Sequence, residues 1–193
     1  YALTTVSRSA KGDAAERSDL VRAIGAGAAW GRAVHRTLEW LACGGEESAL
    51  AARAEFIARD ERLSARQDAV ALAQLVQQVV GRPEWKALAA ARERIVEFPL
   101  MEWRTGDARM PVLVEGVVDA AYRDDGGWTV LDWKTDLDDA AWTARRPQYQ
   151  AQVDQYAAML ARATGCDATG VLVRVLPTDT QGNSPLGPPT AGG

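Results

Sequence analysis

Hydrophobic residues recur at helical spacing in the first half of the chain and at strand spacing in the second half. Residues 19–42 are predicted to form a helix. Trp30, Val34, Leu38 and Leu41 follow one another at intervals of four, four and three residues, which is typical of a core-facing stripe. The Gly44-Gly45 pair then ends the helix.

An alanine-rich stretch, residues 47–80, continues the helical pattern and has a predicted break near Leu63-Ser64. Gly81 ends this stretch. Pro83 is suited to the first turn of another short helix, which we expect to reach about Arg92. Residues 19–92 are therefore expected to be largely helical.

The pattern changes after residue 93. Three segments rich in Val, Leu, Ile and Trp are predicted to be strands, followed by a helix and a fourth strand: 94–104, 112–122, 128–135, 147–163 and 170–177. This order predicts one α/β domain over residues 19–177, with a mixed sheet flanked by helices and a helical N-terminal part. Residues 1–18 are expected to be a flexible N-terminal segment, and the Pro/Gly-rich residues 178–193 a disordered tail.

Composition supports a single globular domain, because the 193 residues are 47% hydrophobic and 25% charged. No apolar run is long enough for a transmembrane helix, and the first residues do not resemble a signal peptide, so a cytoplasmic location is expected. Cys43 and Cys166 are far apart and form no CxxC motif. We therefore expect neither a structural zinc site nor a four-cysteine iron–sulfur cluster.

The net charge of −4 neither favours nor excludes a nucleic-acid partner. Arginines cluster at Arg32 and Arg36 and again at Arg145 and Arg146. These pairs fit either a phosphate-binding groove or ordinary solvated helix faces.

The stretch GVVDAAYRDDGGWTVLDWKTD, residues 116–136, predicts a β-hairpin. Asp125-Gly126 is a favoured two-residue turn. That turn places Asp119 directly opposite Asp132, and Lys134 then points to the same face as Asp132. Hydrophobic spacing alone would predict core residues at these positions.

Lys134 is expected to lie opposite Val117, with Glu115 diagonal to it. Two opposed carboxylates repel each other, and the repulsion becomes severe where water is excluded. A divalent cation bridging both carboxylates offsets this cost, and oxygen ligands suit Mg²⁺ or Mn²⁺. A neighbouring ammonium can orient a water molecule and stabilise the transition state of phosphodiester hydrolysis.

The alternative is an exposed hairpin with solvated acids. The neighbouring residues argue for burial instead, because both faces of the predicted strands are apolar: Val118, Ala120, Tyr122, Leu131 and Trp133. The pattern therefore favours a metal site.

Four motifs in this order resemble those of the PD-(D/E)XK nuclease superfamily, and more narrowly the nuclease domains of RecB- and AddA-type helicase–nucleases. They are the helix GRAVHRTLEWL, then GVVDAAY, VLDWKT, and YQAQVDQYAAML with Tyr149, Gln152 and Tyr156. The resemblance covers about residues 25–176. It implies a restriction-endonuclease-like core.

The resemblance also implies the roles of individual residues. His35, Asp119 and Asp132 would hold Mg²⁺ or Mn²⁺, with the backbone carbonyl of Trp133 as a further ligand. Lys134 would assist the attacking water. Gln152, together with Tyr156, would complete the catalytic set and help to hold DNA or the lysine.

The residues taken alone leave alternatives open. A lone helical histidine such as His35 is more often structural or exposed than a ligand, and Tyr156 also fits an ordinary apolar stripe. Glu97, in VEFPL, matches an E-x-P-hydrophobic segment common in such domains. It is interpreted as an accessory or structural acid.

The function implied is a Mg²⁺-dependent DNA nuclease in double-strand-break repair and recombination, acting on DNA, most naturally a single strand fed by a helicase motor. The sequence contains no P-loop, so the motor would act from elsewhere in cis or in trans. The alternative is a catalytically silent DNA-binding scaffold of the same fold. A small-molecule hydrolase has no nucleophile elbow or Ser–His pair to support it.

Overall fold

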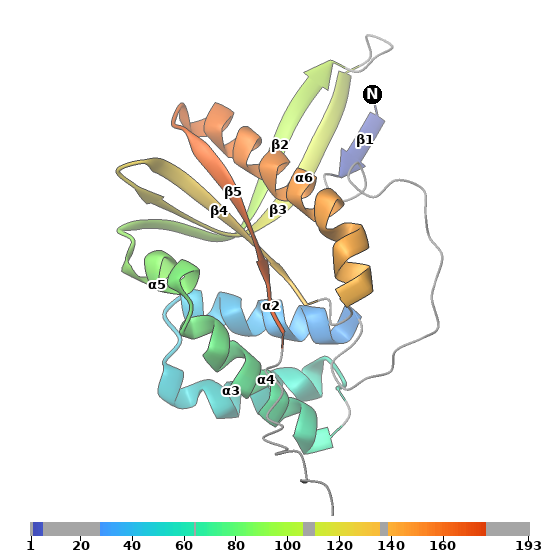
Figure 1. Cartoon of the computed structure of the whole chain (residues 1–193), viewed down its shortest axis with the longest axis vertical. Coiled ribbons are helices and arrows are strands. Elements are labelled where there is room, and N and C mark those ends of the chain that lie inside the picture. Colours follow the sequence, from blue (N-terminus) through green and yellow to red (C-terminus); the bar gives the residue numbers. More distant parts are fainter. Residues whose placement is uncertain (1, 6–27, 64, 106–110, 136–138, 177–193) are drawn as a thin grey trace, which may run out of the picture.

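The structure is a computed structural model and describes residues 2–5, 28–63, 65–105, 111–135 and 139–176. Most of the predicted N-terminal segment, the first nine residues of the predicted helix 19–42, and the predicted tail lie outside the described residues. The helices and strands described below form a mixed α/β arrangement (Figure 1).

The helical half matches the hydrophobic pattern. Its elements are α2 (Ala28–Ala42), the short 3-10 helix η1 (Glu47–Ala49), α3 (Leu50–Asp60), α4 (Ala65–Val80) and α5 (Pro83–Ala90). The predicted stripe from Trp30 to Leu41 is buried in α2. The predicted break is confirmed, because α3 ends where Arg62 adopts a left-handed φ of 57° and Leu63 N–H bonds back to the carbonyl of Ala58.

Within the described residues the sheet has five strands: β1 (Ala2–Thr5), β2 (Glu93–Thr105), β3 (Pro111–Asp124), β4 (Gly127–Lys134) and β5 (Ala168–Arg174). β2 and β4 pair antiparallel with β3, whereas β1–β3 and β4–β5 are parallel pairs. The predicted mixed sheet is confirmed. The pattern did not predict β1, which is a short strand within a polar segment.

Helices cover both faces of the sheet (Figure 1). On one face, α2 to α5 share a core with side chains such as Leu131 and Trp133. On the other face, α6 (Asp139–Thr164) packs on Val118 and Val130. These layers are those of the restriction-endonuclease-like core that the resemblance implies.

Helix α6 is longer than predicted. We expected it to start at Pro147, but it begins at Asp139 and contains that proline. Tertiary contacts stabilise the extra turns: Asp139 pairs with Arg174 of β5 at 2.7 Å, and the guanidinium of Arg174 lies over Trp142. These contacts hold the turns before Pro147 against β5, although the proline removes one hydrogen bond from the helix.

The hairpin register is confirmed over its first five pairs, from Asp124↔Gly127 to Ala120↔Leu131. The ladder ends there, so the prediction that Lys134 lies opposite Val117 is wrong. β2 pairs with one edge of β3. On the opposite edge, β4 pairs with residues 120–124 and β1 pairs with residues 112–115. Residues 116–119 lie between these two pairings, and we call this part of the edge the fork.

No helix among the described residues is both long enough and apolar enough to span a bilayer.

Candidate active site

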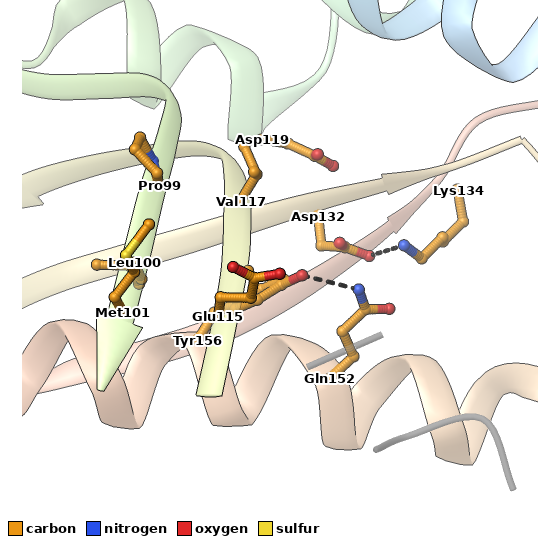
Figure 2. A pocket seen from close by; sticks show the side chains of 11 residues that line it. Pro99, Leu100, Met101, Glu115, Val117, Asp119, Asp132, Lys134, Gln152 and Tyr156 are labelled. Atoms are coloured by element: carbon orange, nitrogen blue, oxygen red, sulfur yellow. Dashed lines mark hydrogen bonds and ion pairs between the residues drawn. The ribbon is translucent and has the colours of Figure 1, made fainter. Parts of the chain in front are cut away.

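A pocket of about 530 Å³ opens at the fork (Figure 2). Carboxylates, an ammonium and an amide meet there with the apolar side chains of β2 and β3. The lining residues are Pro99, Leu100, Met101, Glu115, Gly116, Val117, Asp119, Asp132, Lys134, Gln152 and Tyr156. The pocket thus brings together the hairpin residues and the α6 motif that the sequence indicated.

Asp119 lies at the inner end of the fork. Its Oδ2 accepts a hydrogen bond of 2.8 Å from the backbone N–H of Trp133. The side chain thereby replaces a backbone partner at the point where the β3–β4 ladder ends. This bond holds the carboxylate of Asp119 between β3 and β4. The carboxylate therefore does not face Asp132 as it would in a simple cross-strand pair.

His35 reaches the same carboxylate from α2. Its Nδ1 lies 3.2 Å from Oδ1 of Asp119, and its Nε2 lies 3.0 Å from the carbonyl oxygen of Trp133. Close approach of α2 to the end of β4 helps to place the ring, because a Cβ on Gly31 would lie only 3.4 Å from the hydroxyl of Thr135. Burial lowers the pKa of His35, but Asp119 outweighs burial and raises it.

Glu97 completes a cluster with His35 and Asp119. In the β2–β3 register it faces Asp119, between the pairs Val96↔Ala120 and Phe98↔Val118. One ligand atom from each of the three residues lies within 4.8 Å of the other two. Glu97 also has a left-handed φ of 45°, a conformation that costs an ordinary residue about 1–2 kcal/mol.

The chemistry of this trio fits a divalent cation. An imidazole nitrogen and two carboxylate oxygens are ligands that Mn²⁺ accepts readily and Mg²⁺ accepts with more oxygen around it. Burial, followed by the charge of Asp119, raises the pKa of Glu97 to about 7. Two carboxylates placed this close destabilise each other unless a proton or a cation lies between them.

Asp132 and Lys134 form a buried ion pair beside the trio. The Nζ of Lys134 lies 2.7 Å from Oδ2 of Asp132 (Figure 2). Burial and then Asp119 raise the pKa of Asp132 to about 6. Burial lowers the pKa of Lys134, but Asp132 outweighs it and raises that pKa, so the ammonium form is favoured.

Helix α6 forms the opposite wall of the pocket. Gln152 donates a 3.0 Å hydrogen bond to the hydroxyl of Tyr156, and both side chains are buried. The ring of Tyr156 lies so close to Gly116 that a Cβ there would overlap it. Two turns before Tyr156, the ring of Tyr149 lies 5.0 Å from the Nζ of Lys134 and so confines the lysine.

The predicted site residues therefore share one pocket or its immediate border. The resemblance named Asp132 as a ligand. Its carboxylate pairs with Lys134 and lies outside the trio, and its ligand role stays a prediction. The resemblance assigned no ligand role to Glu97, although its E-x-P motif was recognised. The sequence did not predict the β2–β3 register, which brings Glu97 next to Asp119.

The two arginine clusters differ in their surroundings. Arg32 and Arg36 pair with Glu61, and Arg36 also pairs with Asp60, at the end of α3. Arg145 and Arg146 are exposed on α6. The first cluster thus links α2 to α3, and the phosphate-binding role considered for these residues stays a prediction.

Three comparisons with known proteins bear on this geometry. The family model described as "PD-(D/E)XK nuclease superfamily" matches residues 7–184. An ATP-dependent helicase/nuclease subunit of Heliobacterium modesticaldum is 28% identical over 142 residues, which are 65% of this chain and 10% of that protein. The chain therefore spans about a tenth of that relative. A solved structure titled "Crystal structure of SSO0001" aligns with a TM-score of 0.38 and 16% identity, over 78% of this chain and 74% of that one.

Proposed function

Because the chain belongs to the PD-(D/E)XK nuclease superfamily, we propose that it hydrolyses the phosphodiester bonds of DNA in a reaction that requires Mg²⁺ or Mn²⁺. One observation carries the proposal. His35, Glu97 and Asp119 offer ligand atoms within 4.8 Å of one another, beside the buried Asp132–Lys134 pair. A cation site next to a fixed ammonium is what phosphodiester hydrolysis requires.

His35, Glu97 and Asp119 would hold the cation, with Asp132 and the carbonyl oxygen of Trp133 as the further ligands expected from the resemblance. When bound, the cation supplies positive charge that stabilises the transition state and lowers the pKa of a bound water.

The surrounding groups orient the ligands. The backbone N–H of Trp133 fixes Asp119, and Nε2 of His35 lies 3.0 Å from the carbonyl oxygen of Trp133, so these two atoms would face the same cation. A hydrogen bond from an outer group fixes the direction of a metal-binding carboxylate. These residues therefore prepare the site before a cation arrives.

Lys134 would act on the reacting phosphate. Its ammonium is confined between the carboxylate of Asp132 and the ring of Tyr149. In that position it can hydrogen-bond the attacking water or a non-bridging oxygen and offset the negative charge that develops there. Gln152 and Tyr156 would shape the wall that the DNA strand meets.

The biological setting is a further part of the proposal. The similarity to a protein named as an ATP-dependent helicase/nuclease subunit supports a helicase motor as partner. We propose further that the substrate is a DNA single strand fed by this motor, in double-strand-break repair and recombination. The 193 residues contain no P-loop, so the motor would belong to another part of a larger chain or to another protein.

Digestion of a labelled single-stranded oligonucleotide tests the proposal. The purified chain would be incubated with Mg²⁺, Mn²⁺ or EDTA beside its Asp119→Asn, Asp132→Asn and Lys134→Met variants. We expect cleavage with either metal, none in EDTA, and a loss of at least about a hundredfold in each variant. DNA binding without cleavage under every condition would instead identify the silent scaffold.

A further inference from the structure

The arm formed by β2 and β3 exposes large apolar side chains near the pocket. Met101 is 68% exposed, Trp103 58% and Val117 45%. Single exposed hydrophobic residues are common on protein surfaces, but a contiguous group beside a candidate site indicates a ligand or a partner.

These side chains share one face of the arm. Leu100 is buried, and its cross-strand partner is Gly116, which lies against Tyr156 of α6. Because successive residues of a strand point to opposite faces, the neighbours of Leu100 face away from α6. We call Pro99, Met101, Trp103 and Val117 the apolar stripe.

The apolar stripe is continuous with the candidate active site. Pro99, Met101 and Val117 line the same pocket as Asp119 and Lys134 (Figure 2). Trp103 lies one step further along the strand on the same face. The distance from Glu97 to Trp103 along β2 is about 20 Å, at roughly 3.4 Å per residue.

We propose that the apolar stripe is a subsite that binds the bases of a single DNA strand on one side of the cleaved bond. This inference rests on the proposed function. Aromatic and apolar surfaces stack unpaired bases with little sequence preference. A stacked strand advances about 3.4 Å per nucleotide, so the stripe spans no more than about six nucleotides.

Charge sets the orientation of the strand. Glu115 is the cross-strand partner of Met101 and lines the same pocket. A carboxylate there repels phosphates, so the bases would face the sheet and the phosphates would face solvent. A protein docked on the stripe would instead close the pocket that the substrate must reach, which is why we favour DNA over a protein partner.

Variants of Trp103 test the subsite. Binding of a fluorescein-labelled 20-nucleotide single strand would be measured by anisotropy, with Ca²⁺ in place of Mg²⁺. Cleavage of that strand and of a dinucleotide would be measured with Mg²⁺. The variants are Trp103→Ala, Trp103→Tyr and the control Phe56→Ala, whose side chain on α3 is similarly exposed at 52%.

We expect Trp103→Ala to raise the Kd at least about fivefold, because one stacked base is lost. The ratio of kcat/KM for the 20-nucleotide strand to kcat/KM for the dinucleotide should fall by a similar factor. Trp103→Tyr should retain most of the affinity, because it keeps an aromatic face. Unfolding temperatures would confirm that all three variants are folded.

The outcomes separate the two proposals. If Trp103→Ala and Phe56→Ala bind and cleave alike, the subsite is wrong while the nuclease function stands. If the protein binds DNA through Trp103 but never cleaves it, the nuclease function fails and the subsite stands. If the chain forms dimers that only Trp103→Ala dissociates, with the Kd for DNA unaltered, the stripe is a self-association surface and the subsite is overturned.

Discussion

Glu97 faces Asp119 across the β2–β3 pair, and its backbone holds a left-handed φ of 45° there. Burial and the charge of Asp119 together raise the pKa of Glu97 to about 7. The fold therefore bears both an electrostatic and a conformational cost at one residue. Such costs are common at functional sites, where the binding of a ligand offsets them.

Replacing this carboxyl should separate stability from metal binding. We expect Glu97→Gln to raise the unfolding temperature in EDTA, because it removes a partly buried acid beside Asp119. The same variant should lose most of the stabilisation that Mn²⁺ gives the wild type, which is about 2.7 kcal/mol at a concentration one hundred times Kd. Thermal unfolding with and without Mn²⁺ measures both effects. A variant that is less stable in EDTA yet keeps the full Mn²⁺ effect would contradict the assignment.

The pKa values predict how stability in EDTA depends on pH. In the folded protein the pKa of Glu97 is about 7 and that of Asp132 is about 6. In the unfolded chain both carboxyls have ordinary pKa values and have already lost their protons above about pH 5. The folded state thus binds more protons between about pH 4 and pH 7, so these groups lower the free energy of unfolding as pH rises through that range.

Other acids have lowered pKa values and oppose this pH dependence; one is Glu102, whose pKa is lowered by Arg162. Comparison of the wild type with Glu97→Gln isolates the contribution of Glu97 to the free energy of unfolding. The wild type should lose more stability than the variant between pH 5 and pH 8 in EDTA. Mn²⁺ affinity should rise over the same range, because the cation competes with these protons. Parallel stability curves for the two proteins would show that Glu97 does not titrate there.

The buried ion pair predicts a rescue by double substitution. Lys134→Met leaves Asp132 buried without its counter-charge and should cost roughly 3 kcal/mol in EDTA. Adding Asp132→Asn removes the isolated charge, so the double variant should recover much of that stability. Urea unfolding provides the values. Neither protein should cleave DNA, which distinguishes a restored fold from a restored site. Equal stability of the single and double variants would show that Lys134 does not stabilise the charge of Asp132.

The contact between Gly116 and Tyr156 predicts a steric effect. A Cβ at residue 116 would overlap the tyrosine ring, so Gly116→Ala should destabilise the protein by about 1–3 kcal/mol and displace the hydroxyl that bonds Gln152. Gly81→Ala is a matched control, because the nearest atom to a Cβ there is 3.4 Å away. The idea fails if both alanine variants unfold at the same temperature as the wild type.

Much of this site was predictable because its signals are local in sequence. The Asp125-Gly126 turn fixes the hairpin register, and that register is enough to bring Asp119 and Asp132 to the same part of the sheet. Helical spacing likewise placed Gln152 and Tyr156 on one face of α6, where they bond each other. Such features depend on a few adjacent residues.

The rest depends on contacts between distant segments. The role of Glu97 follows from the register of β2 on β3, which the hydrophobic pattern of the two strands does not determine. The early end of the β3–β4 ladder follows from the side chain of Asp119 taking the N–H of Trp133. The extra turns of α6 depend on Arg174 of β5. Hydrophobic periodicity contains none of this information.

Calorimetric titration of Mn²⁺ tests the central claim most directly, namely that His35, Glu97 and Asp119 form the metal centre of this nuclease domain. Wild type, Asp119→Asn and the surface control Glu55→Gln would be compared at pH 8. We predict binding by the wild type and the control, and an affinity at least about tenfold weaker for Asp119→Asn. Equal Mn²⁺ binding by all three proteins, or none by the wild type, would contradict the account.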